Sequence, residues 1–194
     1  MREFFDPAWH NLKNVYDSGV ICSERHMQCE LFKLLTSNND FNNRYKIFVE
    51  PRLTLPELNS KIPDFLITED DIVVAAVELK YVPHDYSKYE KDLKTLINFC
   101  YLFKQNKDYT FPLLTNPNNG EWTEPKFRFS DKLTLIYCTI TKLDAHIITN
   151  NKKIWQDMSL WKLDDDSKHN EINYLQYVGA IPANIDKNWG YLSQ

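Results

Sequence analysis

The segment spanning residues 61–80, KIPDFLITEDDIVVAAVELK, constrains the fold more than any other stretch of the chain. β-Branched and apolar residues fill two runs, 62–68 and 72–81, and three acidic residues form a short polar connection between them. This pattern predicts a β-hairpin. Because the second run is apolar on both faces until its end, we expect it to be a central, buried strand.

Three charged residues interrupt this apolar hairpin: Asp64, Glu78 and Lys80. Side chains alternate across a strand, so Glu78 and Lys80 point to the same face. The antiparallel arms bring Asp64 beside them, at one end of the hairpin. Burying such charges without partners costs on the order of several kcal/mol, which indicates a functional site. A structural ion pair between Lys80 and either carboxylate is the alternative interpretation.

The residues Pro63-Asp64 and Glu78-Leu79-Lys80, in this order on adjacent predicted strands, resemble the motif of the PD-(D/E)XK nuclease superfamily. The resemblance extends over residues 23–106. It implies an α/β protein with a restriction-endonuclease-like core, in which helices flank a mixed central β-sheet. It also implies a metal-dependent endonuclease that hydrolyses the phosphodiester bonds of DNA.

The resemblance also assigns roles to individual residues of the hairpin. Asp64, Glu78 and the backbone carbonyl of Leu79 would bind Mg²⁺ or Mn²⁺, ions that prefer oxygen ligands. Lys80 would lie beside the attacking water, where it would help to deprotonate or orient the water or would stabilise charge in the transition state. An acidic residue from an early helix would support a second ion or the hydrated shell of the first.

That early helix is predicted over residues 23–36, with Ser23 as its N-cap. At about 100° per residue, Glu24 and Gln28 fall on its apolar stripe, near the N-terminal end. Glu24 therefore fits the acidic role, with Gln28 as a helper, unless it is only a favourable acid in a first helical turn. Glu30 is the fallback. Glu50, in a strand predicted over residues 45–53, is either a further acid of the site or an edge-strand charge.

Basic residues after the hairpin are candidates for substrate binding. A helix predicted over residues 86–105 carries Lys88, Lys91 and Lys94, a stripe that would contact phosphates. The alternative is a solvated helix face, balanced by the neighbouring Glu90 and Asp92.

Two further basic residues follow in a long segment. Residues 111–130 are rich in proline, asparagine and aromatic residues, which predicts a functional loop or hairpin. In it Lys126 and Arg128 alternate with aromatic residues, either as substrate contacts or beside buried rings.

The rest of the chain is expected to complete a single domain over residues 1–194, with a core at about 23–149 and a C-terminal extension over 150–194. A first helix is predicted to begin with Asp6 as N-cap and Pro7 in its first turn. Strands are predicted over residues 132–141 and 145–149, and a helix over 170–178.

Composition limits the protein's class and surroundings. The net charge of -4 argues against a large non-specific nucleic-acid footprint, although a metal ion would supply local positive charge. The four cysteines form no C-x-x-C pair and are expected to be buried, reduced thiols of a cytoplasmic protein. No apolar run approaches the roughly 20 residues of a membrane span.

Two alternatives to a DNA endonuclease follow from these residues. One is an RNA endonuclease on the same scaffold. Viral cap-snatching nucleases share the motif but have a histidine at the helix position where this chain has Glu24. The other is a non-catalytic module that binds nucleic acid or protein, although the intact Asp64, Glu78 and Lys80 argue against it. Cutting both strands of a duplex would favour a homodimer.

Overall fold

The computed structural model describes residues 1–51, 63–84, 92, 95–96, 109–110, 113–116, 121–123, 126–142, 171–181 and 189–191. Their elements, in chain order, are α1 (Arg2–Asp17), α2 (Glu24–Thr36), α3 (Asn39–Arg44), β1 (Lys46–Val49), β2 (Phe65–Glu69), β3 (Ile72–Val82), β4 (Tyr109–Thr110), β5 (Leu113–Asn116), β6 (Glu121–Thr123), β7 (Lys126–Lys142), β8 (Glu171–Ile181) and β9 (Trp189–Tyr191).

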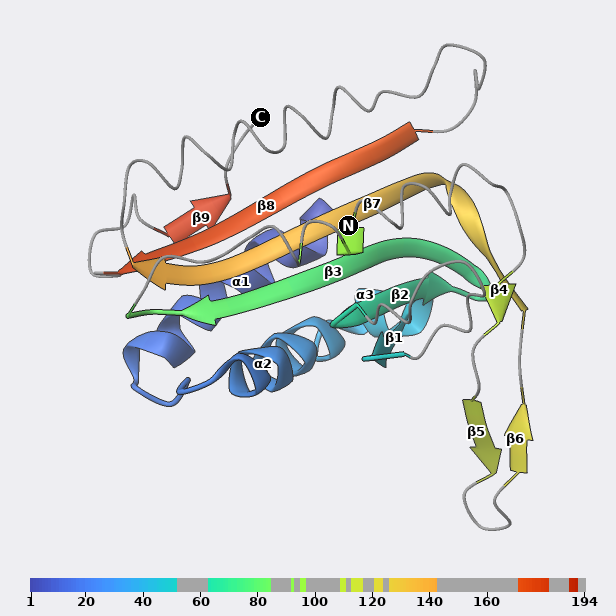
Figure 1. The fold of residues 1–194 in the computed structure, drawn as a ribbon, viewed down its shortest axis with the longest axis horizontal. Helices are drawn as coiled ribbons and strands as arrows, with labels where there is room; N and C mark the ends of the chain where they lie inside the picture. The colour runs from blue at the N-terminus through green and yellow to red at the C-terminus, as the bar shows by residue number, and fades with distance from the viewer. Residues whose placement is uncertain are drawn as a thin grey trace.

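Most of these strands form one mixed sheet, with helices packed against it (Figure 1). The seven-stranded sheet has the order β1-β2-β3-β7-β8-β9, and β4 pairs with β7. Its first three strands are antiparallel, β3, β7 and β8 are parallel, and β9 is antiparallel to β8. β5 and β6 form a separate hairpin that projects away from the sheet. The predicted α/β class with a mixed sheet is therefore confirmed.

The predicted hairpin is confirmed with slightly different ends. β2 and β3 pair antiparallel, from Phe65 opposite Val77 to Glu69 opposite Ile72. Asp70 and Asp71 make the turn, and Asp70 has a φ of 52°. Aspartate tolerates this left-handed conformation better than most residues do, which explains its place in the turn.

One set of alternating strand side chains packs against α1, α2 and α3 to form the hydrophobic core. This set includes Ala75, Val77 and Leu79 of β3 and Ile136, Cys138 and Ile140 of β7. Side chains of the other parity are also buried, and several of them are polar. The strands are thus covered on both faces, as expected for the parallel part of a sheet.

The prediction for the C-terminal part was wrong. Residues 171–181 form strand β8, not a helix, and they lie in the main sheet rather than in an extension. Trp189 of β9 stacks on Trp9 with ring centroids 5.2 Å apart, and its indole N–H donates to the Trp9 carbonyl. Parallel pairing with β7 and packing against α1 decide the conformation, because tertiary contacts outweigh local propensity.

Helix α1 begins earlier than predicted. It starts at Arg2, so Pro7 lies inside the helix and Asp6 is not its N-cap. The Asp6 carboxylate instead accepts a hydrogen bond of 2.7 Å from the Tyr177 hydroxyl. Proline removes one backbone donor from the helix. Burial of Phe5 before the proline outweighs this loss, since its side chain is fully enclosed.

Strand β7 is also longer than predicted, since it begins at Lys126 and includes the end of the supposed loop. The strand predicted over residues 145–149 lies outside the described residues. Of the cysteines, Cys138 is buried as expected, but Cys22 and Cys29 are exposed. Cys22 lies in the segment before α2 and Cys29 lies within α2, and neither belongs to the hydrophobic core.

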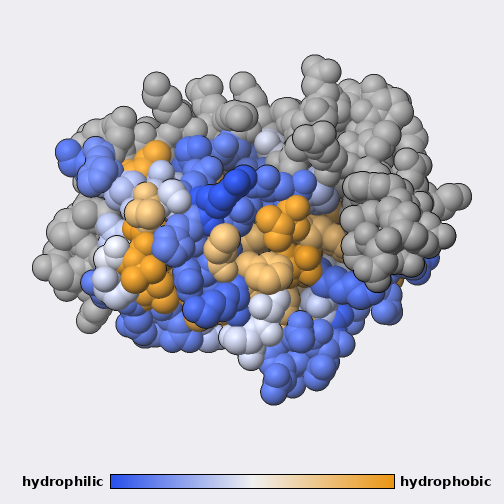
Figure 2. Space-filling view, turned by 90° about the horizontal axis from the view of Figure 1, so that it is seen from below, coloured by the Kyte–Doolittle hydropathy of each residue, from blue (hydrophilic) through white to orange (hydrophobic). Residues whose placement is uncertain are grey.

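Seen from below the orientation of Figure 1, the surface of the described residues is mainly hydrophilic, with separate hydrophobic patches (Figure 2). Large hydrophobic side chains that remain exposed among the described residues are Val20 and Val49. None of the described helices has the length and apolar character needed to cross a membrane.

Candidate metal and nucleic-acid site

The candidate site lies beside the end of β3, which extends past its pairing with β2. β2 begins at Phe65, opposite Val77, whereas β3 runs on to Val82 with no strand paired to it on that side among the described residues. Two carboxylates bond to the β3 backbone there. The Leu79 N–H donates to Asp64 Oδ2 at 2.6 Å, and the Tyr81 N–H donates to Glu24 Oε2 at 3.1 Å. The open sheet edge thus explains locally why acidic side chains are held here.

The predicted ligand role of the Leu79 carbonyl is compatible with this edge. In an antiparallel pair, the N–H and C=O of one residue point toward the same neighbouring strand. The Leu79 N–H points to Asp64, so the Leu79 carbonyl belongs to the same open edge. Backbone oxygen and carboxylate oxygen are therefore presented together.

Gln28 and Glu50 complete the side of the site that faces α2. Gln28 is 6% exposed, and its Nε2 donates at 3.4 Å to the Asp64 carbonyl and at 3.5 Å to Asp64 Oδ1. The same amide lies 3.5 Å from Glu50 Oε1, and the Glu50 N–H donates to the Asp64 carbonyl at 3.1 Å. Glu50 has a φ of 48° and is also 3.6 Å from the Arg25 guanidinium. Of the two roles left open for Glu50, this position matches the acid beside the site.

Glu78 lies on the opposite face of β3 from Leu79, and its side chain is only 6% exposed. Its Oε1 atom has no hydrogen-bond partner among the described residues. Pairing across the parallel strands places Tyr137 of β7 next to Glu78 and Gln176 of β8 next to Tyr137. A buried polar row thus runs across the sheet from Glu78. A buried carboxylate oxygen with unmet hydrogen-bonding capacity is typical of functional sites.

Lys80 forms ion pairs with two of the surrounding acids. Its Nζ lies 3.5 Å from Glu24 Oε2 and 3.5 Å from Asp92 Oδ2. Partial burial opposes the charged form of Lys80, but the carboxylates of Asp92 and Glu24 outweigh it and raise the pKa of the ammonium. Lys80 is therefore a cation at neutral pH.

Asp92 is a member of the cluster that the sequence interpretation missed. It was expected to balance lysines on a solvated helix face, yet it is 8% exposed and pairs with Lys80. A signal was present in the sequence. Asp92 lies three and four residues before the buried Thr95 and Leu96, and this spacing puts all three on one helix face.

Five carboxylates therefore influence one another here: Glu24, Glu50, Asp64, Glu78 and Asp92. Burial raises the pKa of Asp64 from 3.8 to about 6, although the Leu79 N–H opposes this, and the neighbouring acids raise it further. Burial, followed by the charges of Asp64, Asp92 and Glu24, raises the pKa of Glu78 from 4.5 to about 9, with Lys80 opposing. The site thus carries an excess of negative charge.

These groups fit a hard divalent cation. Mg²⁺ and Mn²⁺ prefer carboxylate, carbonyl and water oxygens, which are what Asp64, Glu78 and Leu79 offer. The described His, Cys, Asp and Glu side chains do not form a ready-made group of three or more metal ligands. Mg²⁺ does not need such a cage, because it commonly keeps several waters and takes only one or two protein carboxylates.

Three of the predicted residues that the structure describes are not part of this cluster: Glu30, Arg128 and Lys126. Glu30, the fallback acid, forms an ion pair of 3.2 Å with Lys33 of its own helix. Arg128 pairs with Ile72, six residues along β3 from Glu78, so it lies roughly 20 Å away at 3.3 Å per residue. Lys126 lies still further along β7. The predicted basic stripe, Lys88, Lys91 and Lys94, lies outside the described residues.

Comparison with protein-family models, with curated proteins and with solved structures found no match for this chain.

Proposed function

We propose that this chain has a restriction-endonuclease-like core and is a Mg²⁺- or Mn²⁺-dependent endonuclease that hydrolyses the phosphodiester bonds of DNA. The observation that carries the proposal is the excess of carboxylates around Asp64 and Glu78 at an open sheet edge. A bound cation would compensate this charge and satisfy the buried Glu78 Oε1.

Each residue of the cluster has a distinct part in this proposal. Asp64, Glu78 and the Leu79 carbonyl would hold the ion, and Glu24 would support its hydrated shell. When bound, the ion supplies charge stabilisation at the phosphate and activates a water. Gln28 holds the Asp64 carboxylate and its backbone carbonyl in place. Support of this kind commonly changes metal affinity by about 10–100-fold.

Lys80 is better suited to stabilise charge than to accept a proton. Its pKa is raised by Asp92 and Glu24, so it remains an ammonium at neutral pH. An ammonium beside a phosphate stabilises the negative charge that develops in the transition state. A general base would need the neutral amine at the working pH.

The test is cleavage of supercoiled plasmid with Mg²⁺, Mn²⁺ or a chelator. The wild type is expected to nick or linearise the plasmid only with metal, and Asp64→Asn is expected to abolish this activity. The matched control is Asp71→Asn, an exposed turn residue of the same hairpin, which should cleave at the wild-type rate. Cleavage that persists in Asp64→Asn or in chelator would refute the proposed site.

Lys80→Met gives an independent test of the ammonium. It should lower the cleavage rate by about 100-fold or more, a loss typical of removing one group that stabilises a developing charge. Lys46→Met, at an exposed position of the edge strand β1, is its control. If no DNA is cut, the same proteins should be incubated with single-stranded RNA, and metal binding should be measured by calorimetry. Cleavage of RNA alone would assign the RNA endonuclease, and absence of both activity and metal binding would favour the non-catalytic module.

A further inference from the structure

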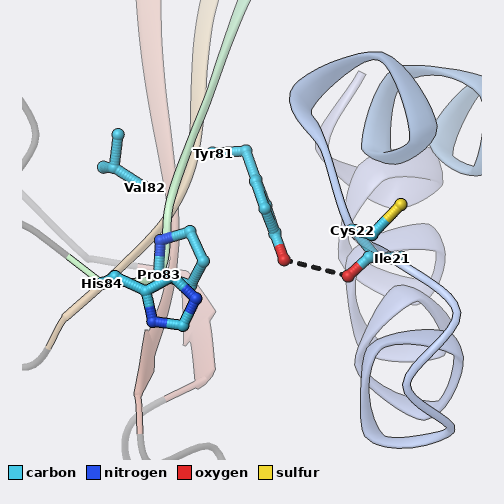
Figure 3. Close-up of a pocket in the computed structure, with 6 residues that line it drawn as sticks. All are labelled: Ile21, Cys22, Tyr81, Val82, Pro83 and His84. Atoms are coloured by element: carbon cyan, nitrogen blue, oxygen red, sulfur yellow. Dashed lines mark hydrogen bonds between the residues drawn. The ribbon is translucent and has the colours of Figure 1, made fainter.

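A pocket of about 480 Å³ opens at the end of β3, next to the carboxylate cluster. Two segments line it: Ile21 and Cys22, between α1 and α2, and Tyr81, Val82, Pro83 and His84, at and just after the end of β3. Figure 3 shows the Tyr81 side chain reaching from β3 toward the segment that joins α1 and α2. The volume lies within the range of small-molecule sites, roughly 300–1,000 Å³.

Tyr81 connects this pocket to the cluster. Its backbone N–H donates to the Glu24 carboxylate at 3.1 Å, and its hydroxyl donates to the Ile21 carbonyl at 2.9 Å. These two bonds fix the ring as one wall of the pocket (Figure 3). Tyr81 follows Lys80 along the strand, so its side chain lies on the other face of β3, where it packs against the hydrophobic core. The pocket and the cluster meet at Glu24, whose Oε2 accepts from the Tyr81 N–H and lies 3.5 Å from Lys80 Nζ. A strand of nucleic acid with a phosphate at this end of the cluster would have its next nucleotide beside the pocket.

The chemistry of the lining differs sharply from that of the cluster. The described lining residues include no carboxylate, lysine or arginine; they offer the Tyr81 ring, aliphatic side chains, the Cys22 thiol and the exposed imidazole of His84. Such a surface suits a flat, uncharged group with polar edges. A nucleobase has this character, because its faces stack on aromatic rings and its edges accept and donate hydrogen bonds.

We propose that this pocket receives an unstacked nucleobase adjacent to the phosphate at the cluster. The preferred substrate then has an unpaired nucleotide at that position, as in a single strand, a bulge or a junction. This inference rests on the proposed function, since the cluster must hold the neighbouring phosphate. Stacking of one base on an aromatic side chain contributes about 1–3 kcal/mol, which corresponds to roughly a 10- to 100-fold effect on binding or cleavage.

The experiment compares three oligonucleotide substrates: a duplex with one unpaired 2-aminopurine, the same duplex with an abasic position there, and a fully paired duplex. Stopped-flow fluorescence on mixing with the wild type and Mg²⁺ reports entry of the base into the pocket. Steady-state cleavage gives kcat and KM for each substrate. We expect a fluorescence change before cleavage, and a kcat/KM about tenfold or more lower for the abasic and paired duplexes.

Variants test whether the effect belongs to the pocket. His84→Ala, at an exposed position, and Tyr81→Leu, which keeps the backbone N–H, should raise KM for the unpaired substrate with kcat largely kept. Both should also reduce the discrimination against the abasic duplex. His10→Ala, an exposed histidine of α1, is the matched control and should behave as the wild type.

The outcomes separate this inference from the proposed function. Metal-dependent cleavage of all three substrates at equal kcat/KM, with no fluorescence change, refutes base binding in the pocket but agrees with the proposed nuclease activity. A fluorescence change that is the same in His84→Ala as in the wild type also overturns it. Absence of both cleavage and fluorescence change overturns the pocket together with the proposed function.

Discussion

Replacing Glu78 by glutamine should change how the stability of the metal-free protein depends on pH. Glu78 is 6% exposed, and its pKa is raised from 4.5 to about 9, first by burial and then by Asp64, Asp92 and Glu24. The folded protein therefore binds a proton that the unfolded chain releases. The stability that this proton contributes is fully present below about pH 4.5 and is lost as the pH rises toward 9.

The size of the effect follows from this window. Between pH 4.5 and about 9, each pH unit lowers the free energy of unfolding by about 1.4 kcal/mol. The protonation of Asp64 affects the pH dependence of stability only below its raised pKa of about 6. The interval from pH 6.5 to pH 8.5 therefore isolates the effect of Glu78. Over these roughly two units the wild type should lose about 3 kcal/mol from Glu78 alone. Glu78→Gln has no carboxylate to ionise, so it should lack this loss.

Urea unfolding in chelator, followed by the fluorescence of the 5 tryptophans, measures both proteins at the two pH values. Glu3→Gln, an exposed acid in the first turn of α1, is the matched control and should follow the wild type. The quantity compared is the change in the free energy of unfolding per pH unit, in the wild type and in Glu78→Gln. Parallel loss of stability in the two proteins would refute the account of Glu78 as a buried, protonated acid.

A divalent metal should reverse this pH dependence in the wild type. Metal binds the ionised carboxylate, so Mn²⁺ should stabilise the wild type more at pH 8.5 than at pH 6.5. Glu78→Gln should gain much less from the same metal concentration. Equal stabilisation of both proteins would exclude Glu78 as a ligand.

Three further predictions concern the sheet and the support of the site. Gly179→Ala places a Cβ against the indole ring of Trp189, so it should lower the free energy of unfolding in urea by about 1–3 kcal/mol. Unchanged stability would show that Trp189 of β9 does not pack on Gly179. Thr139→Val removes a fully buried hydroxyl that has no hydrogen-bond partner among the described residues, and it should raise the free energy of unfolding by about 1 kcal/mol. Gln28→Leu should weaken Mn²⁺ binding about tenfold in calorimetry while the fold is kept, and wild-type affinity would show that its contacts with Asp64 do not support the site.

The part of the site on the hairpin could be predicted because it depends on local rules. Alternation along β3 puts Glu78 and Lys80 on one face, and an antiparallel turn returns Asp64 to the end of β3. The helical period likewise placed Glu24 and Gln28 on the face of α2 that meets the hairpin. These relations involve neighbours within one element or one turn, so the sequence alone determined them.

Only the tertiary structure decided the rest. Asp92 is buried and paired with Lys80, and Glu50 lies beside Asp64 because β1 ends there; neither contact follows from a local pattern. Residues 171–181 are a strand because β7 offers a parallel partner and α1 a surface to pack on, at a distance of many residues along the chain. The free energy of such non-local pairing and burial exceeds the modest local preference of a segment for helix or strand. Predictions from composition and hydrophobic period were therefore correct for the hairpin and wrong for the C-terminal strand β8.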